Sequence, residues 1–560
     1  MIILGISFLS DASACILKNG KIISAISEER INRKKLFYGI PTESINRVLK
    51  LSKININDVD YIATHCKVKK IDRSKYFLKV IKEINDSNIS DQIKRKKIIF
   101  LKKRLKHENF VINQRTPSYL DKLKKYNLPI LNFEHHECHA SSAYYGSNFK
   151  NSLIITADGW GEDGSASIWN GINGNMQLIK KTKTIDSLGY FYGSVTKALG
   201  FIPHRHEGKV LGLAAYSKLR EPIKDISEMI YYDKSKKVFK GNFVNSNYLT
   251  DFQNPHLSKI VKKYKREDIA YSTQKTLEKC LIDLVESFNN KKINISLAGG
   301  IFANVVVNQK ILETKNVNEI YVFPNMGDGG LSVGAAYLAF NKLKNKRPKP
   351  FKSCLIGPQI DNVDLKRKIE KFKFKYRKLG KNPEKIIARK LSQKKVIALV
   401  NGNMEFGPRA LCNRSIIASA EDKNINNTLN KKLGRSEFMP FAPVSLKKYQ
   451  KKLYFTKGSL NKYNSMTITV KCKKDMINLS PAAVHLDNTA RPQLVDKKNY
   501  PFINDILVEY YKITKIPTLI NTSYNMHEEP IVCDAEDALR AFKESKLDYL
   551  YINNFLVNKK

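Results

Sequence analysis

The start of the chain alternates between apolar runs and small polar turns. Three apolar runs there have the length of β-strands, namely residues 2–7, 14–17 and 22–26. Asn19-Gly20, between the second and third runs, is typical of a two-residue hairpin turn, so the pattern predicts a β-hairpin here. A similar order recurs at 153–169, where a strand leads into the turn Asp158-Gly159-Trp160-Gly161 and a second strand follows. The chain therefore predicts a duplicated strand–turn–strand plan.

Two further glycine turns precede helical stretches. The first contains Gly299 and Gly300 and opens a helix through Asn304, and the second contains Gly327 and opens a helix at 331–342. Glycine lets backbone N–H groups approach phosphates closely, and helix N-termini favour negative charge. Any α/β protein has glycine turns after strands, but the paired turns favour a duplicated α/β domain of the actin–hexokinase type that holds nucleotide phosphates.

Two histidines and two aspartates form a candidate metal site. His135 and His139 stand four residues apart, so on a helix they share one face. Asp158 follows an apolar run at 152–157, and Asp328 lies in a glycine turn. Imidazoles and carboxylates together suit iron, zinc or manganese. The alternative is a structural histidine pair that binds no ion.

The C-terminal part contains arginines beside proline and glycine turns. A polar stretch with two prolines predicts a linker at 341–353, which separates a first domain at 1–340 from a second at 354–560. In the second domain Arg409 and Arg414 follow a Gly-Pro turn, and Arg491 precedes a proline. Arginine offers a planar fork for phosphate or carboxylate. The alternative for each is a structural arginine that bonds loop carbonyls.

The amino-acid composition bears on the partners of the protein and on its location in the cell. The net charge of +46 allows a nucleic-acid partner. However, lysine far outnumbers arginine, and we favour an AT-rich coding bias and expect no stable nucleic-acid partner. The basic run at 94–106 predicts an amphipathic helix, either solvated or in peripheral contact with an acidic glycan, phospholipid or tRNA. The eight cysteines are scattered, no apolar run is long enough for a membrane span and the start does not resemble a signal peptide, so we expect a cytoplasmic protein.

Together these motifs resemble the O-carbamoyltransferase family represented by nodulation protein NodU and the antibiotic-tailoring enzyme TobZ, and most closely its NodU-like branch. The resemblance covers nearly the whole chain. Its motifs are residues 135–140 (HHECHA), 158–162 (DGWGE), 207–216 (EGKVLGLAAY), 298–300 (AGG), 407–411 (GPRAL), 437–443 (EFMPFAP), 489–491 (TAR) and 521–523 (NTS).

The resemblance implies two chemistries. A YrdC-like C-terminal domain would make carbamoyl adenylate from carbamoyl phosphate and ATP, with Mg²⁺ accompanying ATP. A TsaD-like N-terminal domain would pass the carbamoyl group, beside Fe²⁺ or another divalent metal, to a hydroxyl of a sugar or glycolipid. The implied residues are His135, His139, Asp158 and Asp328 for the metal, Arg409, Arg414, Arg491 and Ser523 for carbamoyl phosphate and the adenylate, and Lys209, Gly299, Gly300, Asn304 and Gly327 for the nucleotide.

The chain departs from the family pattern at two positions. Family members usually carry a histidine just before the aspartate of the first turn, where this chain has Phe8-Leu9-Ser10-Asp11. Asp11 or another group would then replace that histidine as the base, or transfer is slow or lost. Cys412 also stands where glycine is usual. The alternatives are a tRNA-directed relative and a nucleotide-binding protein that has lost transfer. For partners, the sequence also allows a homodimer.

Overall fold

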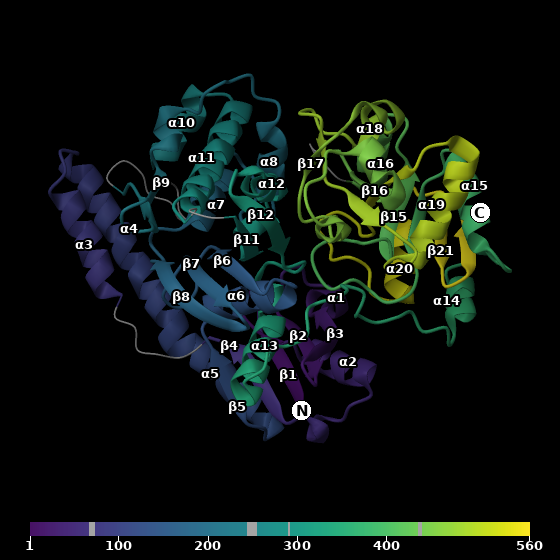
Figure 1. The fold of residues 1–560 in the computed structure, drawn as a ribbon, viewed down its shortest axis with the longest axis horizontal. Coiled ribbons are helices and arrows are strands. Elements are labelled where there is room, and N and C mark those ends of the chain that lie inside the picture. The colour runs from purple at the N-terminus through teal and green to yellow at the C-terminus, as the bar shows by residue number, and fades with distance from the viewer. Residues whose placement is uncertain (67–72, 244–254, 289–291, 435–439, 560) are drawn as a thin grey trace. The chain divides into compact units, whose positions relative to one another are not determined.

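The computed structural model describes residues 1–66, 73–243, 255–288, 292–434 and 440–559 (Figure 1). The mixed α/β class predicted from the sequence is confirmed. The chain divides into two compact units: Met1–Phe8, Leu17–Lys21 and Ile56–Pro350 form the first, and Leu9–Ile16, Ile22–Asn55 and Phe351–Lys560 form the second. The predicted boundary therefore differs from this division, because parts of the first 55 residues group with the C-terminal region. Helix α13 (Leu331–Lys344) also extends into the predicted linker.

The first sheet has the order β3-β2-β1-β4-β5. Its strands are β1 (Ile2–Ser7), β2 (Ser13–Lys18), β3 (Lys21–Ser27), β4 (Tyr61–His65) and β5 (Ile130–Phe133). Asn19 and Gly20 link β2 to β3 with φ angles of 49° and 78°, so the predicted hairpin turn is confirmed. Strands β1, β4 and β5 are parallel, and their carboxyl ends therefore meet at one edge.

The second sheet has the order β12-β11-β6-β7-β8. Its strands are β6 (Asn151–Ala157), β7 (Ala166–Ile172), β8 (Asn175–Thr182), β11 (Ile293–Ala298) and β12 (Val317–Val322). The pair β6 and β7 confirms the strand–turn–strand predicted at 153–169. Strands β6, β11 and β12 are parallel, so the residues that follow them lie at a common edge, where α/β sheets bind ligands.

Helices α6 (His135–Gly146) and α13 pack against each other and against the two sheets. Helix α13 contacts β1, β4 and β5, whereas α6 contacts β6, β7 and β11. A Cβ at Gly334 of α13 would lie 2.0 Å from the carbonyl oxygen of Cys138, so only glycine allows this close approach. The other long helices of the unit are α3 (Ser74–Asn85), α4 (Asp91–Phe110), α5 (Thr116–Leu123), α7 (Leu188–Ala198), α8 (Glu207–Ala214), α10 (Pro255–Lys263), α11 (Arg266–Glu286) and α12 (Val305–Glu313).

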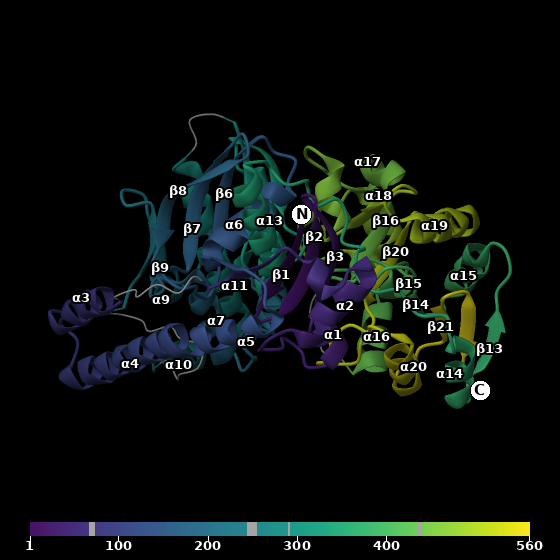
Figure 2. The ribbon, with the colours of Figure 1, turned by 90° about the horizontal axis from the view of Figure 1, so that it is seen from below.

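Helix α4 contains the basic run predicted to be helical at 94–106, and α3 lies beside it (Figure 2). Lys97 and Arg104 of this run are buried, so the basic residues are not all on a solvated face. Among the described residues, no helix combines the length and apolar character needed to cross a membrane. All eight cysteines are buried free thiols, in agreement with the absence of a disulfide framework in the sequence.

The second unit is built on a sheet with the order β13-β22-β21-β14-β15-β20-β16-β19. These strands are β13 (Lys375–Lys378), β14 (Ile397–Val400), β15 (Arg414–Ser419), β16 (Ala442–Leu446), β19 (Gln493–Val495), β20 (Thr518–Ser523), β21 (Tyr549–Ile552) and β22 (Phe555–Asn558). The helices of the unit include α1 (Glu29–Asn32), α2 (Thr42–Ser52), α14 (Leu365–Lys371), α15 (Pro383–Ser392), α16 (Ile425–Leu433), α18 (Lys474–Leu479), α19 (Pro501–Thr514) and α20 (Ala535–Glu544). Helices α15 and α19 pack together, and their buried side chains join those of the sheet in one core.

Candidate functional site

The first unit brings two histidines together at the start of α6. The side chain of Glu134 accepts a hydrogen bond from the N–H of Glu137 and caps this helix, which begins at His135. His135 and His139 then lie one turn apart on the same face, with ring centroids 4.8 Å apart. His136, between them, bonds Thr156 and the carbonyl of Gly164 instead, so it is a satisfied core histidine.

Two carboxylates complete the cluster. Asp158 follows β6, and Asp328 lies in the turn that precedes α13. Nε2 of His139 lies 3.2 Å from Oδ2 of Asp158 and 3.6 Å from Oδ1 of Asp328. Nε2 of His135 lies 3.7 Å from the same oxygen of each carboxylate. The ligand atoms of all four residues lie within 4.8 Å of one another, so the sequence-predicted metal residues meet at one point.

This geometry fits a divalent metal ion. Metal–ligand bonds of about 2.1 Å place neighbouring ligand atoms roughly 3.0–3.4 Å apart, close to the distances between these side chains. Nε2 of His135 is buried and has no hydrogen-bond partner among the described residues, as expected of an atom that binds an ion. The two histidines are buried, whereas the carboxylates are 19% and 26% exposed, which leaves one side of the cluster open. An open side is typical of catalytic sites.

The charges in the cluster shift each other's titration. Burial lowers the pKa of His135, but the neighbouring carboxylates of Asp158 and Asp328 outweigh it and raise this pKa to about 9. Burial raises the pKa of Asp158, but His135 and His139 outweigh it and hold this pKa well below its usual range. The metal-free cluster therefore retains a proton on His135 at neutral pH, and a bound cation would replace that proton.

A second layer of contacts holds these ligands. The N–H of His135 donates to Glu162 over 2.8 Å, and burial together with the charge of Glu134 raises the pKa of Glu162 to about 7. The hydroxyl of Ser7, at the end of β1, donates to the carbonyl of Asp328 over 2.9 Å. Both contacts hold the backbone of a ligand residue and so fix the positions from which the His135 and Asp328 side chains extend.

The predicted glycine turns lie directly beside the cluster. Gly299 has a φ of 106°, and a Cβ there would lie 2.2 Å from the carbonyl oxygen of Ala157. A Cβ at Gly300 would lie 2.9 Å from Oδ1 of Asp158. The N–H of Gly299 donates to the carbonyl of Met326 over 2.7 Å and links this turn to the one that contains Gly327. Three of the candidate nucleotide residues therefore border the metal ligands.

The other two candidate nucleotide residues, Asn304 and Lys209, and the candidate base Asp11 have different surroundings. Asn304 caps α12 through the N–H of Val307, and its amide donates to Gln274 of α11, so both ends of its side chain serve the fold. Lys209 is buried in α8. Asp11 belongs to the second unit and lies in the turn before β2 with a φ of 48°.

One histidine near the cluster is not among the residues predicted from the sequence. His65 ends β4, and its ring lies 5.9 Å from that of His135. Its Nε2 lies 2.7 Å from the carbonyl oxygen of Phe8, and its Nδ1 lies 2.9 Å from Sγ of Cys66. Burial and the charge of His135 lower the pKa of His65 to about 3, so the ring is neutral. The strand-end argument used for Asp158 would have found it, because 61–65 is an apolar run that ends in histidine.

In the second unit, three of the predicted anion-binding segments are joined by hydrogen bonds. Nδ2 of Asn521 donates to Oε1 of Gln493 over 2.8 Å and to the carbonyl of Ala410 over 3.1 Å. Nε2 of Gln493 donates to the carbonyl of Leu411 over 3.3 Å. The segments that contain Arg409, Arg491 and Ser523 are therefore held side by side, and all three of these side chains are half-buried. Residues 435–439, which include the start of the EFMPFAP motif, lie outside the described residues.

Arg414 has the surroundings of a structural arginine. It is fully buried, and its guanidinium donates five hydrogen bonds to the backbone carbonyls of Pro358, Asn401, Gly402, Asn413 and Cys533. These carbonyls occupy the guanidinium fork that an anion would need. These contacts favour the alternative for Arg414, a structural arginine that bonds loop carbonyls, and its role as a ligand for carbamoyl phosphate stays a prediction.

Cys412 is one of the two positions at which the chain departs from the family pattern. Its φ of 75° lies in the left-handed region, which glycine adopts at little cost. The thiol is buried and donates to Oε1 of Gln493 over 3.3 Å. The backbone at this position thus has a conformation that favours glycine, although the residue is cysteine.

Comparison with known proteins identifies the family to which this chain belongs. Residues 2–337 match the family model of the carbamoyltransferase N-terminus, and residues 388–559 match that of the carbamoyltransferase C-terminus. The chain belongs to the carbamoyltransferase family, as its motifs predicted. It is therefore an enzyme of the carbamoyltransferase class.

Named relatives extend over most of the chain. An uncharacterized protein of Methanocaldococcus jannaschii is 32% identical, and the match covers 100% of this chain and 99% of that protein. Nodulation protein NolNO of Sinorhizobium fredii is 28% identical, over 99% of this chain and 80% of that protein. Nodulation protein U of the same species is 26% identical, over 70% and 72% respectively.

Solved structures resemble the chain more distantly. Component A of (R)-2-hydroxyglutaryl-CoA dehydratase from Acidaminococcus fermentans has a TM-score of 0.36 and 17% identity, over 61% of this chain and 98% of that chain. Full-length HypF in its phosphate- and nucleotide-bound form has a TM-score of 0.34 and 15% identity, over 61% and 46%. These likenesses are partial and do not define the fold of this chain.

Proposed function

We propose that the protein is an ATP- and carbamoyl phosphate-dependent O-carbamoyltransferase that modifies a hydroxyl of a sugar or glycolipid precursor in the cytoplasm. The observation that carries this proposal is the cluster of His135, His139, Asp158 and Asp328 bordered by glycine turns. That arrangement suits a divalent cation next to phosphate oxygens. The arginine and serine segments, which hydrogen bonds join in the second unit, would supply the groups that bind the anions of the activating step.

The proposed reaction has two parts. Cleavage of carbamoyl phosphate by water releases phosphate and leaves carbamate, whose oxygen bonds to the α-phosphorus of ATP as pyrophosphate departs. The acceptor hydroxyl then bonds to the carbamoyl carbon of the adenylate, AMP leaves and a base takes the hydroxyl proton. Arg409, Arg491 and Ser523 would hold the anions of the first part through positioning and charge neutralisation. A divalent cation held by the four ligands, iron or another metal, would stabilise negative charge on the phosphate.

An assay without acceptor measures the activating step separately from transfer to the hydroxyl. Purified protein is incubated with ATP, carbamoyl phosphate and Fe²⁺ or Mg²⁺ without acceptor, and pyrophosphate and carbamoyl adenylate are measured. We expect both to form and to be lost in Arg491→Ala and Ser523→Ala. Arg377→Ala, which replaces an exposed arginine on β13, serves as the matched control. Folded, metal-loaded protein that forms neither product would contradict the activation mechanism. A panel of nucleotide sugars and glycolipids then tests the acceptor class.

A further inference from the structure

Two arginines from the N-terminal segment 22–55 hold two loops of the second unit that are remote in sequence. Arg30 donates to the carbonyl of Gly407 over 2.9 Å. Arg33 donates to the carbonyls of Pro530 and Ile531 over 2.6 and 2.8 Å. Each loop adjoins a segment that contains a proposed anion ligand. These contacts therefore tie the start of the chain to the activating half of the proposed site.

Arg30 fixes the turn that leads into Arg409. Its side chain is buried and pairs with Glu29 over 3.3 Å, and Glu29 in turn accepts the N–H of Leu36 over 2.7 Å. The guanidinium thus reaches Gly407 from a fixed position. Gly407 lies two residues before Arg409 and has a φ of 133°, in the region that favours glycine. Loss of the Arg30 contact would free the carbonyl of this turn.

Arg33 binds two carbonyls of the loop 530–533, whereas Arg30 binds one carbonyl of its turn. Besides its two carbonyl contacts, Nε of Arg33 lies 3.3 Å from Oδ1 of Asp537. The other carboxylate oxygen of Asp537 accepts the N–H of Cys533 over 3.0 Å. The loop is therefore held at Pro530 and Ile531 by the arginine directly, and at Cys533 through the aspartate.

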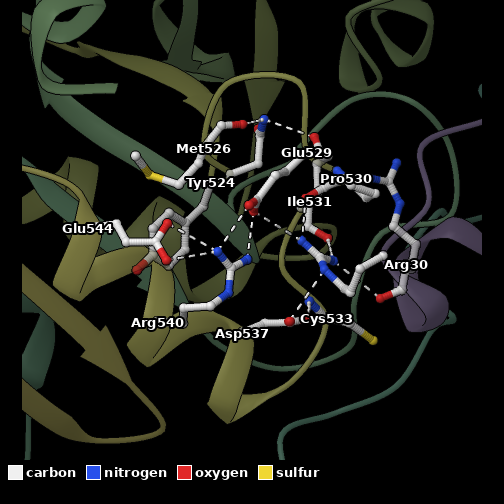
Figure 3. Close-up of polar contacts among 12 residues, drawn as sticks. Arg30, Tyr524, Met526, Glu529, Pro530, Ile531, Cys533, Asp537, Arg540 and Glu544 are labelled. Atoms are coloured by element: carbon white, nitrogen blue, oxygen red, sulfur yellow. Dashed lines mark hydrogen bonds and ion pairs between the residues drawn. The ribbon is translucent and has the colours of Figure 1, made fainter. Parts of the chain in front are cut away.

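A chain of hydrogen bonds connects this loop to Ser523. The hydroxyl of Ser523 donates to Oδ1 of Asn525 over 2.6 Å, and the amide nitrogen of Asn525 donates to the carbonyls of Met526 and Glu529. The carboxylate of Glu529 is bound by both terminal nitrogens of Arg540, over 2.6 and 3.0 Å (Figure 3). Glu529 immediately precedes Pro530, so displacement of the loop would shift the partner of Asn525 and, through Asn525, the serine.

We propose that Arg30 and Arg33 are positioning residues that set the geometry of the anion site through its two loops. This inference rests on the proposed function insofar as Arg409 and Ser523 bind the substrate anions. It goes beyond that function because it makes the segment 22–55 part of the activating half of the enzyme. Arg30 acts on the Gly407–Arg409 turn, and Arg33 acts on the loop that supports Ser523.

The first test does not depend on activity. Amide hydrogen exchange is measured by mass spectrometry on the full chain of the wild type, Arg30→Met, Arg33→Met and the control Lys34→Met, which alters an exposed neighbour. We expect Arg30→Met to lose protection, at least tenfold, in 405–411 alone, and Arg33→Met in 524–533 alone. Unchanged protection in both variants would overturn the proposal. Loss spread over the whole second unit would also overturn it, since the arginines would then only stabilise the fold.

The second test uses acceptor-free pyrophosphate formation. The value of kcat/KM for carbamoyl phosphate should fall about 10- to 100-fold in Arg30→Met and Arg33→Met, because small displacements of binding groups have effects of this size. Arg30→Lys should recover most of the loss, since lysine can donate the one bond to Gly407. Arg33→Lys should not, because lysine lacks the fork that spans two carbonyls and a carboxylate. Equal recovery by both lysines, or wild-type kinetics in the methionine variants, would contradict the proposal. An inactive wild type would instead refute the proposed function and leave hydrogen exchange to decide.

Discussion

Replacement of Arg414 by methionine is expected to destabilise the second unit strongly. The guanidinium is fully buried and donates five hydrogen bonds to backbone carbonyls. Hydrogen bonds from a charged donor contribute about 1.5–3 kcal/mol each, but the cost of burying the guanidinium offsets much of that sum. Methionine removes the charge and leaves several buried carbonyls without this donor. An unsatisfied buried acceptor costs about 1–3 kcal/mol, so after the relief of the burial cost we expect a net loss of about 3–5 kcal/mol. For a domain of roughly 150–250 residues this corresponds to a fall in Tm of about 6–20 °C.

Calorimetry and denaturant unfolding of the full chain measure this loss. Arg409→Met is the matched variant, since it removes the same charge from a half-buried side chain five positions earlier. It should lower Tm much less than Arg414→Met and yet abolish acceptor-free pyrophosphate formation. An Arg414→Met protein that melts with the wild type but makes no pyrophosphate would refute the reasoning, because Arg414 would then be a ligand for the substrate anion.

Three further predictions concern the metal cluster and one strained turn. Metal-free protein titrated with Zn²⁺ between pH 6.5 and 9 should release about one proton per ion, and its affinity should rise about tenfold per pH unit, because the ion displaces the proton of His135, whose pKa is raised to about 9. Gly300→Ala should weaken Zn²⁺ binding about 10- to 100-fold in calorimetry, since the new Cβ would lie 2.9 Å from Oδ1 of Asp158. Cys412→Gly should be more stable than Cys412→Ala by about 0.5–1 kcal/mol in urea unfolding, because only alanine is strained at a φ of 75°.

Each of these predictions has a control or a contradicting result. The protonated state of His135 stabilises the metal-free fold fully below pH 6.5, and this contribution is lost as pH rises through about 9. A Zn²⁺ affinity that does not change over that window would contradict the assignment. A Cβ at Gly208 meets no atom within 4 Å, so Gly208→Ala should bind Zn²⁺ like the wild type. Equal stability of the two Cys412 variants would show that the turn relaxes around alanine.

Local features of the fold could be predicted from the sequence because their causes are local. The hairpin at Asn19-Gly20 follows from the backbone angles that these residues adopt readily. The shared face of His135 and His139 follows from helical spacing. Asp158 could be placed at the end of a strand because an apolar run precedes it, and parallel strands then bring such ends to one edge.

Features that depend on distant contacts could not be predicted in this way. Arg414 and Arg409 both follow the same Gly-Pro turn, and only the packed structure shows that the carbonyls of Pro358 and Cys533 surround Arg414. The strand-end argument could place His65 at the end of β4, but not its contact with Phe8 or its position beside His135, because these partners lie 57 or more residues away in the chain. No local pattern indicates that residues 22–55 group with the C-terminal region, because the contact between Arg33 and Ile531 spans 498 positions.

The composition of the second unit from both ends of the chain has a consequence for biosynthesis. A ribosome adds about 5–20 residues per second, so Arg33 is made roughly 25–100 s before Ile531. During that time the segment 22–55 lacks the loops that it binds in the finished protein, although the first unit can already be complete. Translation must therefore pass Ile531 before the second unit can close, and a chain that stops after the first unit leaves a nascent segment exposed to chaperones and proteases.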